Sequence, residues 1–339
     1  MTMRARVLGL YALLIVMNVG AWAAAFLAFW SHPVLLGTAL LAFTFGLRHA
    51  VDADHICAID NVTRKLMQES RRPIGVGFFF SLGHSTVVVA LTVAVAIGAA
   101  VVKGHLPALA QIGALVGTSV SAAFLLLIAA INLVVLVEIF GAFARARRGE
   151  AIEDERLGAM LDRRGLLGRL FRPLLRVVDR SWKMYPVGVL FGLGFDTATE
   201  VALLGIAAVE AGKGLPVFAI LIFPLLFTAG MSLVDTTDGI VMVGAYGWAF
   251  VKPMRKLYYN LVITLVTVHV AVIVGAIEAT SVIAGQLRLN GGMWDALKAV
   301  NENFGTLGFI IVGLFVACWL VSIGVYRLLR YDDAFRLPS

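Results

Sequence analysis

The amino-acid sequence predicts an all-α membrane protein whose chain crosses the bilayer eight times. Of its 339 residues, 60% are hydrophobic and only 14% are charged, which is more apolar than the composition of a soluble domain. Apolar runs of the length that a transmembrane helix requires, about 20 residues, recur at 7–30, 34–61, 74–102, 115–141, 184–210, 216–248, 256–284 and 304–328. Residues 1–141 and 184–339 therefore hold four predicted spans each, the second set followed by a short tail, and residues 142–183 join them within one integral membrane domain.

The distribution of positive charge predicts which side of the membrane each loop faces. With the N-terminus inside, 23 of the 28 Lys and Arg residues fall in inside segments, among them the turn Arg64–Arg72, and only four fall outside. Short loops rich in Lys and Arg face the cytoplasm, so both termini are predicted to be cytoplasmic, in a multi-pass protein of the cytoplasmic (inner) membrane. The net charge of +7 follows from this topology and indicates no nucleic-acid partner.

The long loop 142–183 is predicted to lie on the cytoplasmic side as well. In its later half, 157–178, apolar residues alternate with Arg. This pattern is typical of an amphipathic helix that lies on the anionic inner surface of the lipid bilayer.

A dense group of ionisable residues lies inside the second predicted span. Arg48, His49, Asp52, Asp54 and His55 fall within eight residues, and each charge at the bilayer centre costs roughly 2.5 to 3.5 kcal/mol. A bound cation offsets that cost. On a continuous helix His49, Asp52 and His55 share one face, and two imidazoles with a carboxylate suit Ni, Co, Zn or Cu better than Mg or Ca. Arg48 and Asp54 then face elsewhere and neutralise each other or a neighbouring helix; the alternative is a purely structural polar network.

Further polar residues occur at similar depth in other spans. His84 lies about ten residues into the third run, among hydroxyl side chains, and is either a core residue or another ligand. Asp196 and Glu200 share a face of the fifth run, and Asp235 and Asp238 share a face of the sixth. Four acids in two neighbouring spans are expected to line the path of a cation.

The two halves of the chain show a weak internal repeat. The Phe-Gly-Leu sequence at 45–47 recurs at 191–193, and the segment 80–85 resembles 227–232. The offsets, 146 and 147 residues, nearly agree. Because the second predicted span runs inward and the fifth outward, the repeat is predicted to be inverted, as in many secondary transporters.

Four motifs taken together resemble the nickel/cobalt transporter family of bacterial and fungal permeases. They are RHAVDADHI at 48–56, FFFSLGHSTVVV at 78–89, LGFDTATE at 193–200 and GMSLVDTTDG at 230–239. The resemblance covers nearly the whole chain. It implies an eight-helix permease that takes up Ni²⁺, Co²⁺ or both at low external concentration, with the ion as substrate and no cofactor.

The resemblance also implies which residues form the central signature. Its His-x4-Asp-His element falls here on His49, Asp54 and His55. The helical face instead favours Asp52, and a local unwinding of the helix would reconcile the two. Both carboxylates therefore stay candidates.

Two other function classes compete with uptake. A metal-resistance exporter can share the same scaffold, and an intramembrane metalloenzyme is the weaker alternative because the chain contains no HExxH sequence and its six histidines form no paired boxes. No GxxxxGK[ST] loop occurs, so no ATP hydrolysis is expected of this chain, and no ATPase subunit is evident in it.

Overall fold

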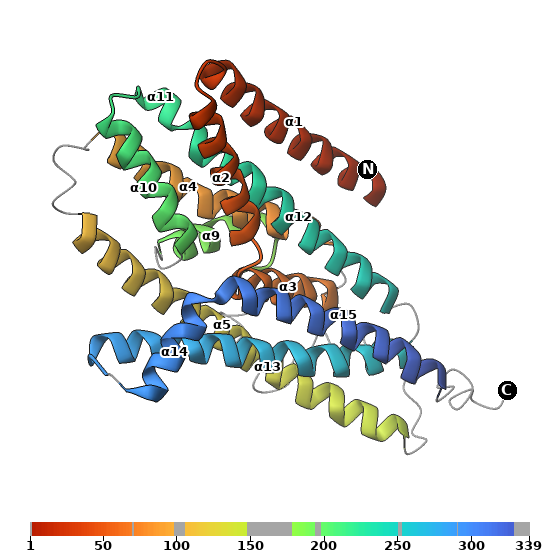
Figure 1. The fold of residues 1–339 in the computed structure, drawn as a ribbon. Coiled ribbons are helices and arrows are strands. Elements are labelled where there is room, and N and C mark those ends of the chain that lie inside the picture. Colours follow the sequence, from red (N-terminus) through yellow and green to blue (C-terminus); the bar gives the residue numbers. More distant parts are fainter. Residues whose placement is uncertain are drawn as a thin grey trace.

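The computed structural model describes residues 2–69, 71–97, 106–147, 178–193, 198–249, 253–289 and 291–328, and all regular elements in these ranges are helices (Figure 1). In chain order they are α1 (Met3–Phe29), α2 (Pro33–His49), α3 (Ala53–Gln68), α4 (Val76–Ile97), α5 (Leu106–Arg147), the short 3₁₀ helix η2 (Ser181–Lys183), α9 (Met184–Gly192), α10 (Ala198–Gly212), α11 (Val217–Ile220), α12 (Ile222–Ala249), α13 (Pro253–Gln286), α14 (Gly292–Glu302) and α15 (Phe304–Leu328). The predicted amphipathic helix at 157–178 falls almost entirely outside the described residues.

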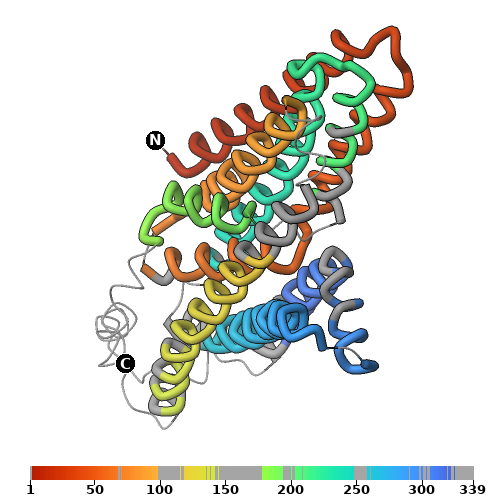
Figure 2. Tube along the Cα trace, turned by 90° about the vertical axis from the view of Figure 1, so that its left-hand side faces the viewer, coloured from red at the N-terminus to blue at the C-terminus, as the bar shows by residue number. Residues whose placement is uncertain are grey.

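Helix α3 lies between two groups of helices. Figures 1 and 2 show α1, α2, α4 and α10 to α12 in one group, and α5, α13, α14 and α15 in the other. Helix α3 packs against α4 and α12 of the first group and against α5, α13 and α15 of the second. The chain therefore places its most polar helix at its centre.

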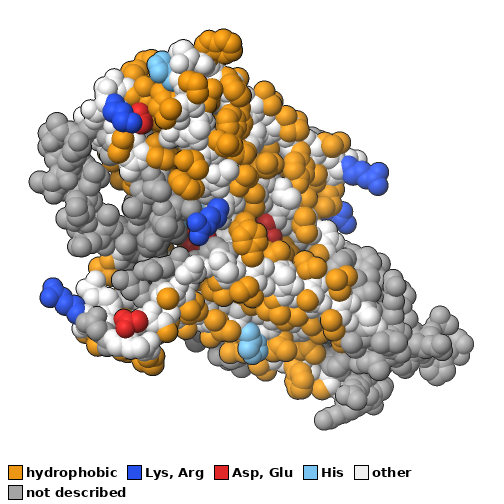
Figure 3. Space-filling model, viewed as in Figure 1, with side chains coloured by type: hydrophobic (Ala, Val, Ile, Leu, Met, Phe, Trp, Pro, Cys, Tyr) orange, Lys and Arg blue, Asp and Glu red, His pale blue; other side chains and the backbone are white. Residues whose placement is uncertain are grey.

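The described part of the chain is a helical membrane protein. Five of its helices are long and apolar enough to cross a bilayer, and the number rises to six if the bent pair α2–α3 counts as one span. Hydrophobic side chains cover much of the face drawn in Figure 3. Leu27, Trp30 and Val34, for example, are each at least 80% exposed, as expected where lipid replaces water.

The second predicted span is not one continuous helix, as the helical-face argument assumed. Helix α2 ends at His49, α3 begins at Ala53, and their axes differ by 51°. Asp52 takes an extended conformation (φ −63°, ψ 146°) as the N-cap of α3, a position that Asp favours.

The predicted end of this span also differs from the end of the helix. Helix α3 continues to Gln68, so Arg64 and Lys65, predicted to lie in the cytoplasmic turn, are buried. Arg71 and Arg72 do lie exposed beyond the helix.

Glycines bring four of the core helices into backbone contact. A Cβ atom added to Gly46 of α2 would lie 2.1 Å from the carbonyl oxygen of Phe227 in α12, and one added to Gly188 of α9 would lie 2.0 Å from that of Phe80 in α4. Such close approach needs residues without side chains. The positions of α2 and α9 are thus fixed against α12 and α4.

We predict that Gly46→Ala lowers the apparent melting temperature of the detergent-purified protein, because the new methyl group displaces the backbone of α12. Overpacking of this kind costs about 1 to 3 kcal/mol. The matched control is Gly37→Ala on the same helix, where nothing lies within 4 Å of the added atom. Equal melting temperatures for the two variants would show that the α2–α12 contact is looser than described.

Candidate metal site

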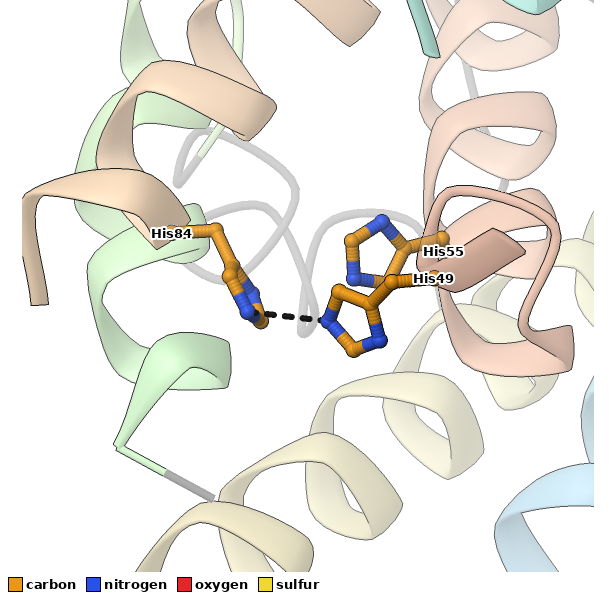
Figure 4. A group of neighbouring side chains, drawn as sticks. All are labelled: His49, His55 and His84. Atoms are coloured by element: carbon orange, nitrogen blue, oxygen red, sulfur yellow. Dashed lines mark hydrogen bonds between the residues drawn. The ribbon is translucent and has the colours of Figure 1, made fainter. Parts of the chain in front are cut away.

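Three buried histidines from three helices converge at the centre of the molecule. They are His49 at the end of α2, His55 in the first turn of α3 and His84 in the middle of α4. One ring nitrogen from each lies within 4.8 Å of the others, and Figure 4 shows the three rings turned toward one another. Three imidazoles in this arrangement form half or more of the coordination shell of a first-row divalent cation.

The break between α2 and α3 makes this convergence possible. On a continuous helix, residues six apart are separated by about 9 Å along the axis. In the structure the ring centroids of His49 and His55 are only 4.6 Å apart. The three residues between the helices therefore bring together two side chains that a straight helix would hold apart.

Two of the imidazoles are held by carboxylates through Nδ1. His49 Nδ1 donates to Asp52 Oδ2 at 2.8 Å, and His55 Nδ1 lies 3.3 Å from both carboxylate oxygens of Asp235 in α12. Carboxylates in this position fix the ring and its tautomer and leave Nε2 as the ligand atom. The Nε2 atom of His55 is buried and has no hydrogen-bond partner among the described residues, as expected of an atom that binds a metal ion.

The third histidine approaches a carboxylate of the second half of the chain. His84 Nε2 donates to Glu200 Oε1 of α10 at 2.7 Å, and it lies 3.0 Å from His49 Nε2. The same Glu200 oxygen is 3.8 Å from His49 Nε2. One oxygen and two nitrogens thus surround a single point, where a cation can replace the proton of His84.

Aromatic rings close two sides of the cluster. Phe80 packs edge-on against His55 with centroids 4.8 Å apart, and Phe227 lies 5.6 Å from His49. These phenylalanines open the two repeated segments that were identified in the sequence. Their place in the repeat is evident from the sequence, but nothing in the sequence indicates that their rings pack against the histidines.

The other candidate residues lie apart from the three rings. Asp54 is half-buried, and its Oδ1 accepts from the backbone N–H of His55 at 2.9 Å. Arg48 is exposed and makes no ion pair with Asp54, although both residues are described. Asp238 follows Asp235 by one turn of α12, with Oδ2 buried and unpartnered, and Asp196 lies outside the described residues.

A helical membrane protein with a buried tri-histidine cluster, framed by carboxylates and built at a helix break, has the features of a membrane carrier for a transition-metal cation. Residues 35–325 match the family described as high-affinity nickel-transport protein (NicO), and the chain belongs to this family. It is therefore a member of a transporter family and not an enzyme.

Curated relatives are similar over most of their length. The chain is 58% identical to the high-affinity nickel transport protein of Cupriavidus necator, over 98% of this chain and 94% of that one. It is 43% identical to the nickel transporter NixA of Staphylococcus aureus, over 95% and 94%, and 43% identical to the cobalt transport protein NhlF of Rhodococcus rhodochrous, over 84% and 81%. No solved structure matches the chain.

We predict that His49→Ala and His55→Ala each weaken Ni²⁺ binding by more than about 100-fold. Loss of a residue that only supports a metal ligand already costs up to about 100-fold in affinity. Each change removes a nitrogen ligand that the surrounding oxygens cannot replace. Binding is measured by calorimetric titration of the purified protein. The control is His269→Ala, whose exposed ring contacts only the Leu265 carbonyl among the described residues; unchanged affinity in both cluster variants would remove the histidines from the site.

The geometry also separates the two candidate aspartates of the motif. Because Asp52 holds the His49 ring and Asp54 contacts only backbone, Asp52→Asn is expected to weaken Ni²⁺ binding by about 10- to 100-fold and Asp54→Asn by less. The same titration measures both. The reverse order would make Asp54 the ligand, as the family signature implies.

Proposed function

We propose that this chain carries Ni²⁺, Co²⁺ or both into the cell across the cytoplasmic membrane as a secondary permease. The observation that carries the proposal is the buried cluster of His49, His55 and His84 at the α2–α3 break. Relatives named for nickel and for cobalt transport are both more than 40% identical to this chain, which supports both ions as substrates.

The donor set favours these metals over other cations. Imidazole nitrogens suit Ni²⁺ and Co²⁺, whereas Mg²⁺ and Ca²⁺ prefer oxygen alone. The described cluster contains no cysteine, so it lacks the thiolate that selects Cu⁺. Three nitrogens and the Glu200 oxygen leave room for water ligands, so the ion needs to shed only part of its hydration shell.

The carboxylates around the cluster have two roles in this proposal. Asp52 and Asp235 hold the His49 and His55 rings in place through Nδ1. Glu200, with Asp196 on the same run of sequence, lowers the electrostatic barrier that a dication meets in the membrane. Asp54 lies next to His55 and is the alternative ligand.

The proposed topology has eight spans with both termini in the cytoplasm. In this topology, helices α9, α10 and α15 form the additional spans, beyond the five or six helices that are long and apolar enough to cross a bilayer by themselves. One membrane domain then consists of 1–141, the cytoplasmic loop 142–183 and 184–339. The lipid bilayer and the metal ion are the only partners that this arrangement needs, without an ATPase subunit.

An inverted repeat is part of the same proposal, and the helix crossings support it. Helix α2 crosses α12 at the segments 45–47 and 227–232, and α9 crosses α4 at their counterparts 191–193 and 80–85. If each segment is replaced by its counterpart in the other half, the α2–α12 crossing becomes the α9–α4 crossing. The histidine cluster then lies where the two halves meet, as in other carriers built from inverted repeats.

Uptake and efflux make opposite predictions for metal accumulation in whole cells. Cells that express the chain are expected to accumulate more Ni²⁺ or Co²⁺ than cells expressing His55→Ala at the same membrane level. The measurement is elemental analysis of washed cells after exposure to trace metal, with and without an uncoupler. Lower accumulation than in the His55→Ala cells would identify an exporter instead.

A further inference from the structure

The histidine cluster uses only the first turn of α3, yet the helix stays buried far beyond that turn. Every residue from His55 to Met67 is buried, including Asp60, Arg64 and Lys65. Charged side chains are almost never fully buried unless they are paired or bind an ion. The polar side chains beyond the first turn therefore need a role of their own.

Helix α12 runs beside α3 in the same direction. His55 near the start of α3 contacts Asp235, and Met67 near its end packs in one cluster with Tyr246 of α12. The two helices thus leave the histidine cluster together and run toward the end of the molecule that is proposed to be cytoplasmic. Side chains between them are therefore successively further from the metal site, toward that end.

Two carboxylates lie on adjoining turns of this helix pair: a Cβ atom added to Gly239, which follows Asp238 in α12, would lie 3.6 Å from the side chain of Ile59, which precedes Asp60 in α3. Asp60 of α3 is fully buried; its Oδ1 accepts from the Tyr246 hydroxyl of α12, and its Oδ2 has no hydrogen-bond partner among the described residues. Asp238 of α12 likewise has a buried Oδ2 without a hydrogen-bond partner among the described residues. A buried carboxylate oxygen without a partner is costly, and two of them on adjoining turns are suited to a cation that both can bind.

A guanidinium lies one turn further along α3. Arg64 is fully buried and donates to Thr264 Oγ1 of α13 at 3.0 Å and to Asn61 Oδ1 at 3.3 Å. Its Nε has no partner, and no carboxylate of the described residues lies within the 4.0 Å of an ion pair. Arg64 follows Asp60 by one turn of the same helix. A fixed positive charge therefore stands directly beyond the two carboxylates.

We infer that Asp60 and Asp238 form a second, inner site for a divalent cation, which receives the ion after it leaves the histidines. The inference rests on the proposed function. Oxygen ligands hold Ni²⁺ and Co²⁺ less tightly than imidazoles do, and repulsion by Arg64 weakens the hold further. The ion is thus stabilised on its route without being trapped there.

Nickel titration of the full-length protein in lipid nanodiscs tests the inner site. The native protein is expected to bind one tight and one weaker equivalent of Ni²⁺. Asp60→Asn and Asp238→Asn keep the tight equivalent, lose the weaker one and slow maximal uptake by at least about tenfold. Arg64→Gln tightens the weaker equivalent, because the repelling charge is gone.

Two further variants separate an ion site from a structural role. If Asp60 only balances the charge of Arg64, the double variant Asp60→Asn/Arg64→Gln restores native uptake; if Asp60 handles the ion, uptake stays low while the tight equivalent persists. Asp60→Glu keeps a carboxylate and is expected to keep uptake. Asp179→Asn is the control for removal of a carboxylate elsewhere in the protein. Asp179 forms an ion pair with Lys183 and belongs to neither α3 nor α12.

The outcomes also distinguish this inference from the proposed function. Loss of the tight equivalent in His55→Ala supports the histidine site whatever happens at Asp60. A native protein with a single equivalent, a weaker equivalent that survives in both Asn variants, or recovery in the double variant would each overturn the inner site and leave the histidine site standing.

Discussion

The interruption of the helix at residues 50–52 is the constraint on which the site depends. Without it, His49 and His55 would be separated by about 9 Å along one axis, whereas at the break their ring centroids are 4.6 Å apart. The break leaves few backbone groups unpaired, because the N–H groups of Ala50, Val51 and Asp52 bond to carbonyls within the turn. Satisfied backbone is what allows irregular structure at membrane depth. Helix α15 holds the turn in place: a Cβ at Gly308 would lie 1.5 Å from the Val51 carbonyl oxygen.

The third histidine reaches the cluster because helices approach closely elsewhere. Lipid supplies no hydrophobic force between helices, so packing of small residues takes its place. Glycines on α2 and α9 let those helices touch the backbones of α12 and α4, and a further glycine, Gly77, brings α4 to the Asp235 carbonyl of α12. His84 of α4 and His49 of α2 come within 3.0 Å of each other because both helices pack closely against α12 at glycines, Gly77 and Gly46.

Sequence reasoning identified the residues of the candidate metal site, because the density of ionisable groups inside an apolar run is a local property. It also predicted that acids of the second half line the path of a cation, and two of them, Glu200 and Asp235, contact His84 and His55. It assumed a continuous helix, since the sequence around Asp52 does not distinguish a buried N-cap residue from a residue on a helix face. It also assigned Arg64 to a surface turn. The buried guanidinium of Arg64 donates hydrogen bonds to Asn61 and Thr264, and Thr264 lies 200 residues further along the chain, so a local reading of the sequence misses it.

The chemistry of the two halves of α3 suggests how direction arises along one helix. Its first turn offers imidazole nitrogen, which binds Ni²⁺ and Co²⁺ tightly enough for capture from dilute solution. Its later turns offer carboxylate oxygen and then a buried positive charge. In the proposed mechanism an ion passes from strong to weak ligands, so the last step of release starts from a weakly held ion. Capture and release are then properties of successive turns of the same helix, and the break before Ala53 places the capture site where both halves of the protein can reach it.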